Sequence, residues 1–179
     1  MMKMRWMLGM FMVLSLSLSA CGLSETKEVD QNEVEAEASD PDMSGFVMDQ
    51  DEDSILVVTP MDDDGSGDEG RAMWVSGAPE GLWVGKQVEV WVDGDIAESY
   101  PEQATAEKVQ ELEMSEVQGA DLKASEALSA ALSETEQEQA DVLIVSLLSF
   151  DEESDQWTVK LDRRGTNQGE WKTTVKDEK

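Results

Sequence analysis

The sequence predicts a β-rich α+β protein. It comprises a small closed or nearly closed β-barrel and then an α-β-β-β unit, behind a signal peptide and an acidic linker. Three observations support this fold class. Short apolar runs separated by turn residues recur from residue 45 to residue 116, one helical stretch follows, and two strictly alternating runs end the chain. Short strands at this spacing favour a barrel, which leaves no sheet edge open.

The first 20 residues have the form of a lipoprotein signal peptide. Lys3 and Arg5 give a positive start, and Met7 to Leu18 is apolar but shorter than the roughly 20 residues that a membrane-spanning helix needs. Leu18-Ser19-Ala20-Cys21 is a lipobox. We therefore expect lipidation of Cys21 by diacylglycerol and palmitate. Two or more acyl chains hold a protein durably on the membrane, here on the extracytoplasmic face of a bacterial cell.

The charge and the residue inventory exclude several function classes. The net charge is −28, and without the signal peptide 11 basic residues stand against 41 acidic ones, a net charge of −30. Such a chain repels nucleic acid phosphates, so no nucleic acid partner is expected. The chain has no histidine, which excludes Ser-His-Asp and Cys-His catalysis and imidazole-bound zinc. We expect a protein that is not an enzyme.

Composition divides the chain into four parts. Residues 1–20 are the signal peptide, and residues 21–44 are the lipidated cysteine and a linker too acidic and too poor in large apolar residues to fold. Residues 45–116 are the barrel domain, and residues 117–179 are the C-terminal α+β unit. Whether these two pack together is not readable from the sequence.

Five segments are candidates for the barrel strands. Gly45–Met48 and Ile55–Thr59 form a hairpin around a polar turn, Asp49–Ser54. Ala72–Val75 is a third strand. In Gln87–Val92 the three valines share the inward face, which turns Trp91 outward. The period of Thr105–Met114 fits either a strand or a helix.

The C-terminal unit begins with a helix, over about Ala124 to Gln137, that carries one apolar stripe of Leu128, Ala131 and Leu132. Val142–Leu148 is an apolar run typical of a buried strand. Two alternating strands follow, the first with Trp157, Val159 and Leu161 on one face and the second with Trp171, Thr173 and Val175.

Several segments resemble a domain-of-unknown-function family of small Gram-positive lipoproteins, over Gly45 to Val109. They are Gly45-Phe46-Val47, Ile55-Leu56-Val57-Val58, Ala72-Met73-Trp74-Val75-Ser76, Leu82-Trp83-Val84-Gly85, Val88-Glu89-Val90-Trp91, Asp93-Gly94 and Glu98-Ser99-Tyr100-Pro101. The resemblance implies an OB-like antiparallel barrel of five strands, and it implies no activity. The C-terminal unit loosely resembles the helix-then-strands layout of PepSY modules.

An acidic loop is the candidate metal site. Asp62, Asp64, Ser66 and Asp68 have the oxygen spacing of the first half of an EF-hand loop. The bidentate glutamate of an EF-hand falls at loop position 12, which is Met73 here, so a complete EF-hand is excluded. Weak Ca²⁺ binding and a solvated loop between strands remain the two interpretations, and no other cofactor is expected.

Three aromatic residues are the candidate contact site. Trp74, Trp91 and Tyr100 fall in the predicted barrel, and OB-like barrels bind ligands by stacking on such side chains. The alternatives are packing between the two domains for the tryptophans, and for Tyr100 a ring that caps the core. The leading hypothesis is a binding module for an envelope protein, peptide or glycan, tethered to the membrane by its lipid. The alternative is a lipoprotein that binds divalent cations or small solutes through residues 62–69.

Overall fold

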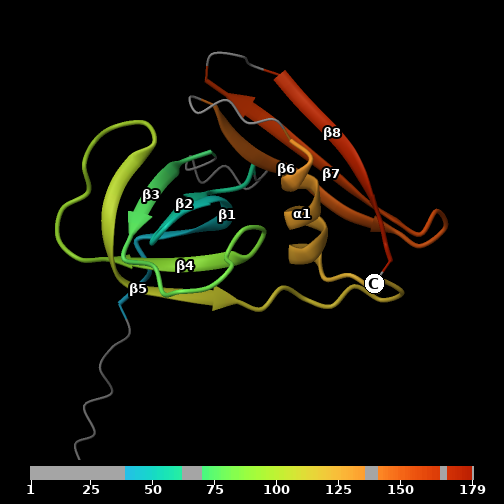
Figure 1. Ribbon diagram of the computed structural model, residues 1–179, viewed down its shortest axis with the longest axis horizontal. Coiled ribbons are helices and arrows are strands. Elements are labelled where there is room, and N and C mark those ends of the chain that lie inside the picture. Colours follow the sequence, from blue (N-terminus) through green and yellow to red (C-terminus); the bar gives the residue numbers. More distant parts are fainter. Residues whose placement is uncertain (1–38, 62–69, 136–140, 166–168, 179) are drawn as a thin grey trace, which may run out of the picture. The chain divides into compact units, whose positions relative to one another are not determined.

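Five strands close into a barrel in the computed structural model, which describes residues 39–61, 70–135, 141–165 and 169–178 (Figure 1). The strands are β1 (Met43–Asp51), β2 (Ser54–Val58), β3 (Ala72–Ser76), β4 (Gln87–Val92) and β5 (Glu102–Leu112). Their order around the barrel is β1-β2-β3-β5-β4, and β4 closes the ring against β1. The predicted OB-like barrel is confirmed, and the segment whose period fitted either assignment is a strand.

One seam of the barrel is parallel. Met73 to Ser76 on β3 run in the same direction as Glu102 to Thr105 on β5, whereas the other four pairings are antiparallel. The sequence predicts an antiparallel barrel, which is correct for four of the five seams. An odd number of strands cannot alternate in direction all the way around a closed ring. At least one neighbouring pair must therefore be parallel.

The barrel interior is filled by the apolar residues that alternate along each strand, because successive side chains of a strand point to opposite faces. Val88 and Val90 are fully buried, as predicted, while Val92 at the end of β4 is half-buried. The interior cluster consists of Met43, Val47, Ile55, Val57, Met73, Val75, Val88 and Val90.

The β1–β2 hairpin is tighter than the sequence indicates. The ladder continues to the pair of Asp51 with Ser54, so only Glu52 and Asp53 form the loop. Glu52 has a φ of 45°, the positive value that tight two-residue hairpin turns need. The sequence does not indicate this pairing, because residues 49–54 are all polar and carry no alternation of apolar and polar side chains.

The C-terminal unit is one helix, α1 (Ala124–Ser133), and a sheet of β6 (Val142–Asp151), β7 (Gln156–Arg164) and β8 (Gly169–Lys176), in the order β6-β7-β8. The predicted helix stripe is buried, and so is the face with Trp157, Val159 and Leu161. The helix ends at Ser133 rather than at 137. No apolar residue continues the stripe after Leu132, so a further turn would gain no burial.

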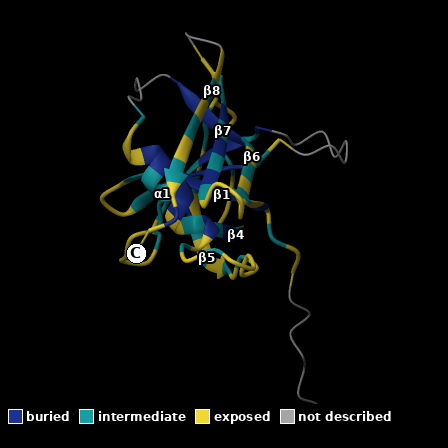
Figure 2. Cartoon of the chain, turned by 90° about the vertical axis from the view of Figure 1, so that its right-hand side faces the viewer, coloured by how far each residue is buried: buried dark blue, intermediate teal, exposed yellow. Residues whose placement is uncertain are grey.

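The barrel and the C-terminal unit share a core. The outer face of β1, β2 and β3 packs against α1, β6 and β7, so the dark blue buried stretches of Figure 2 run through both. Gly85 marks one close approach between the two parts. Its φ is +90°, and a Cβ atom there would lie 2.4 Å from the carbonyl oxygen of Ser125 on α1. Ser39 to Lys179 therefore form one compact unit.

Candidate functional site

An open groove of about 300 Å³ lies over the parallel seam between β3 and β5. We call it the seam groove. Residues of β2, β3, β5 and the loop between β4 and β5 line it: Ser54, Trp74, Ser76, Asp95, Gln103, Ala104 and Thr105. The barrel register aligns most of these residues across three neighbouring strands, and one segment from the β4–β5 loop adds Asp95.

Three hydroxyl groups form a row across the groove. Ser54 on β2 is the register partner of Ser76 on β3, and Ser76 is the partner of Thr105 on β5. Neighbouring strands lie about 4.8 Å apart, so the row spans roughly 10 Å. The Ser76 hydroxyl lies 3.3 Å from that of Thr105 and donates to the carbonyl oxygen of Ala104 at 3.2 Å. With this donation made, the Ser76 oxygen accepts from Thr105, and the Thr105 oxygen keeps free lone pairs for a ligand donor.

Trp74 and Gln103 form the next row. They are register partners across the parallel seam, with Leu56 on the other side of Trp74. The indole of Trp74 is half-buried, since it packs against the shared core while lining the groove. Gln103 is exposed. The groove thus offers an aromatic surface next to hydroxyl and amide groups.

The chemistry of the groove is suited to binding an uncharged ligand. No lysine or arginine lines it, and Asp95 is the single ionisable residue among the lining side chains. Glycoside hydrolysis by carboxylates uses a pair of them, and phosphate binding uses cations or clustered N–H groups. The lining residues supply hydrogen bonds and stacking, without an acid–base pair and without a cation.

Trp91 lies outside the seam groove. It points outward from β4, as predicted, beside Lys108 of β5, whose ammonium is 4.1 Å from the centre of the indole ring. Its Nε1–H donates to the carbonyl oxygen of Ser39 at 2.7 Å. Lys108 is five residues along β5 from Gln103, about 16 Å at the usual rise of a strand. Trp74 and Trp91 therefore belong to different surfaces.

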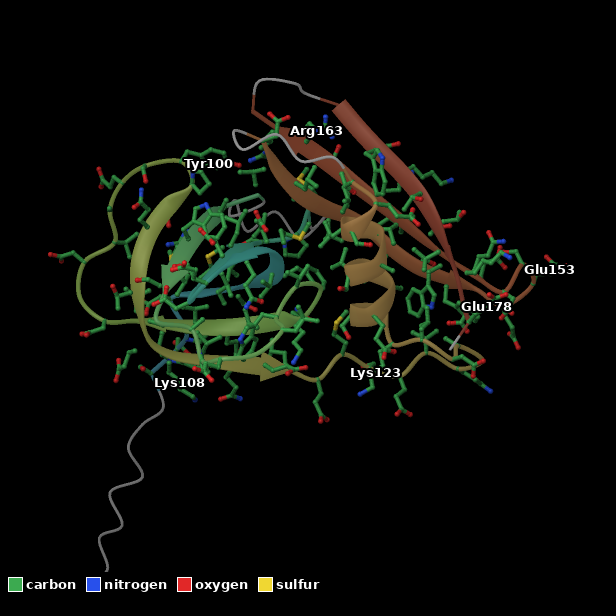
Figure 3. The ribbon with its side chains drawn as sticks, in the orientation of Figure 1. Tyr100, Lys108, Lys123, Glu153, Arg163 and Glu178 are labelled. Carbon is green, nitrogen blue, oxygen red and sulfur yellow. The ribbon has the colours of Figure 1, made fainter. Side chains whose placement is uncertain are left out.

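Tyr100 lies near the start of the parallel seam. Its hydroxyl donates to the carbonyl oxygen of Gly70 at 3.2 Å. The interpretation in which its ring caps the core is wrong, because the residue is 55% exposed. Figure 3 labels Tyr100 and Lys108 on opposite sides of the barrel, so the three aromatic candidates do not form one face.

The remaining candidates lie outside the described residues. These are Cys21 and the acidic loop residues Asp62, Asp64, Ser66 and Asp68. The stem of that loop is described, and there Thr59 and Arg71 pair through the Thr59 N–H and the Arg71 carbonyl at 2.9 Å. Within the described ranges, no group of three or more acidic or cysteine side chains is arranged to hold a metal ion. No helix in that part of the chain is long and apolar enough to cross a membrane.

Sequence reasoning missed the hydroxyl row. Ser76 stands two residues after Trp74, so a strand period puts both on one face, and this signal is present in the sequence. The register between β3 and β5 cannot be read from the sequence, because the two strands are separated by 25 residues that include β4. Asp95 joins the site only through the path of the β4–β5 loop.

The comparisons with known proteins bear on the barrel. No curated protein and no solved structure matches the chain. The resemblance of the barrel residues to a family of unknown function is confirmed, and the matched region covers nearly the whole of the five-stranded barrel. Residues 44–113 match the model of DUF3221, a protein family of unknown function.

Proposed function

We propose that the protein is a membrane-anchored extracytoplasmic lipoprotein that acts as a non-enzymatic binding module for a component of the cell envelope. The barrel is the binding element, and the seam groove is its contact surface. The observation that carries the proposal is the row of Ser54, Ser76 and Thr105 hydroxyls beside the half-buried Trp74.

A neutral glycan is the ligand that best fits these groups. Sugar hydroxyls both donate and accept, so they pair with a row of hydroxyl and amide groups. The apolar face of a pyranose ring stacks on an indole. Nucleic acid is disfavoured, because no cation lines the groove and the whole chain carries a net charge of −28. An uncharged peptide is the second ligand class in keeping with the lining.

The membrane anchor is supported by the lipobox Leu18-Ser19-Ala20-Cys21. The Cys21→Ala protein lacks the thiol that accepts diacylglycerol, so it is expected to stay unprocessed by the lipoprotein signal peptidase. Incorporation of radiolabelled palmitate measures whether the protein is lipidated, the modification that precedes this cleavage. A Cys21→Ala protein that is cleaved after Ala20 and labelled like the wild type would contradict the proposal.

The groove is tested by photo-crosslinking in native membranes. A photoreactive amino acid replaces Thr105, which is exposed in the groove, and in a control protein it replaces the equally exposed Thr174 on β8. We expect glycan adducts at position 105 that are absent at position 174. A peptide or protein adduct at position 105 alone would mean that the ligand is a peptide rather than a glycan. Equal adducts at both positions, or none at 105, would refute a ligand in the seam groove.

A second candidate function is divalent-cation or small-solute binding through residues 62–69. The spacing of Asp62, Asp64, Ser66 and Asp68 supports it. Its test is a Ca²⁺ titration of the thermal unfolding midpoint, with the four-residue alanine variant as control. We expect a rise in the midpoint at millimolar Ca²⁺ in the wild type alone. An identical response in both proteins would remove this candidate.

A further inference from the structure

The four residues before β1, Ser39–Asp42, continue along β4 and hydrogen-bond to it and to Arg71. The Trp91 indole N–H donates to the Ser39 carbonyl at 2.7 Å. Asp42 makes three more contacts. Its N–H donates to the Val90 carbonyl at 2.9 Å, its Oδ2 accepts from the Val92 N–H at 2.8 Å, and its carbonyl accepts from Arg71 Nη1 at 2.8 Å.

One of these bonds, from the Asp42 N–H to the Val90 carbonyl, extends the β1–β4 ladder by one residue, and the other three use the side chains of Trp91, Asp42 and Arg71. Ser39, Asp40 and Asp42 are exposed and Pro41 is only half-buried, so the segment buries no large apolar side chain. The first core residue is Met43, which is 4% exposed. Hydrogen bonds hold Ser39–Asp42, whereas apolar burial holds everything from Met43 onward. The two parts of the chain can therefore separate without breaking the core.

The barrel side chains that bind Ser39–Asp42, those of Trp91 and Arg71, are themselves held in place by their neighbours. Lys108 lies over the Trp91 ring, and Arg71 donates from Nε and Nη2 to Glu102 Oε2 at 3.0 and 2.8 Å. This ion pair fixes the guanidinium so that Nη1 points to Asp42. Three of the four bonds use donors on the barrel and acceptors on the segment, which suits an acidic, extended strand such as Ser39-Asp40-Pro41-Asp42.

We propose that Ser39–Asp42 is a latch, a segment that docks on Trp91, Val92 and Arg71 and can be released while the barrel stays folded. The latch makes the chain leave the barrel at one fixed point. It also occupies the indole N–H of Trp91, so this donor serves an intramolecular contact and does not reach another partner while the latch is docked. This role is independent of what the seam groove binds.

Hydrogen–deuterium exchange of the full chain tests the latch. Trp91→Phe keeps a ring under Lys108 and removes the N–H donor. Asp42→Ala removes the acceptor of the Val92 N–H, and Asp42→Asn restores an acceptor. The matched control is Trp83→Phe, because Trp83 also has a lysine over its ring and donates at 2.7 Å to a carbonyl, that of Pro79 in its own loop.

We expect Trp91→Phe and Asp42→Ala to speed exchange of the Asp42 and Val92 amides about fivefold, the change equivalent to one net hydrogen bond. Exchange in β2 should stay unchanged, and Asp42→Asn and Trp83→Phe should behave like the wild type. The proposal is overturned if Trp91→Phe exchanges like Trp83→Phe. It is equally overturned if faster exchange at Asp42 is always accompanied by faster exchange across β2, since the segment would then open only with the barrel.

Discussion

The hydroxyl group of Ser76 on β3 lies 3.3 Å from that of Thr105 on β5, across the single parallel seam of the barrel. The two residues are brought together by the closure of five strands, which forces one pair of neighbours to run in the same direction. The same register places Trp74 beside Gln103. The parallel pair of β3 and β5 therefore also brings polar side chains together around the indole of Trp74.

The contact between the barrel and α1 is tested by two glycines. Gly85 and Gly94 have nearly equal φ values, +90° and +86°, but a Cβ at Gly85 would meet α1 whereas one at Gly94 would meet nothing within 4 Å. We expect Gly94→Ala to cost about 1 kcal/mol, the backbone term alone. Gly85→Ala should cost at least about 2 kcal/mol more, as overpacking does. Urea unfolding measures both, and equal costs would contradict the close packing of the Gly85 loop on α1.

The C-terminal end of the chain is fastened by Asp177. Its carboxylate, 3% exposed, accepts from the backbone N–H groups of Asp121 and Leu122 and from Trp157 Nε1 at 3.1 Å. Removing it leaves one buried and two part-buried donors without this acceptor, so Asp177→Ala should destabilise the protein by about 3 kcal/mol. Glu178→Ala is the control, because that side chain is 75% exposed and should change stability by less than about 0.5 kcal/mol. Chemical denaturation distinguishes the two, and similar midpoints would refute the role of Asp177.

We expect the turn between β6 and β7 to be stabilised by the ionised carboxylate of Asp151. The N–H of Glu153 donates to Asp151 Oδ1 at 2.9 Å, and this bond, with further ones from Ser154, lowers the pKa of Asp151 below its ordinary value of 3.8. A lowered pKa favours the folded state above the ordinary value, and this stabilisation disappears as the pH falls through the lowered one. An NMR titration of the Asp151 carboxyl carbon should give a midpoint under 3.8. A midpoint at or above that value would contradict the turn geometry.

Trp74 joins the groove to the core. Because it packs against the shared core as well as lining the groove, Trp74→Ala should lower both ligand binding and stability, the latter by about 2 kcal/mol, less than for a fully buried tryptophan. Trp74→Phe should recover most of the stability. A Trp74→Ala protein as stable as the wild type would show that the indole does not pack on that core.

The sequence was sufficient to predict the strands and the helix, but it was insufficient to predict which residues form the candidate site. Val88 and Val90 alternate with polar residues, and Leu128, Ala131 and Leu132 recur at helical spacing, so burial of one face predicted both elements correctly. Tyr100 and Trp91 were grouped with Trp74 because they are aromatic and close in sequence. Strand order separates Trp91 on β4 from Trp74 on β3, since β5 lies between these strands, and strand order depends on contacts distant in the chain.

The shared core was not predictable from either half alone. Phe46, Met48 and Leu56 lie on the outer face of the barrel, and the residues that alternate with them along the strands fill the inside. β1 and β2 are therefore apolar on both faces. Such strands are covered on both sides. The outer face is covered by α1, β6 and β7. The sequence pattern of the barrel strands does not indicate that these elements cover it.

Calorimetric titration measures whether the seam groove binds a neutral glycan. The full chain, Thr105→Val and the control Thr174→Val are each titrated with neutral oligosaccharides of β-1,4-linked glucose and N-acetylglucosamine. We predict binding by the wild type and by Thr174→Val with equal affinity, and an affinity about fivefold weaker for Thr105→Val, the loss of one net hydrogen bond. Binding of equal strength by all three proteins, or by none, would contradict the account.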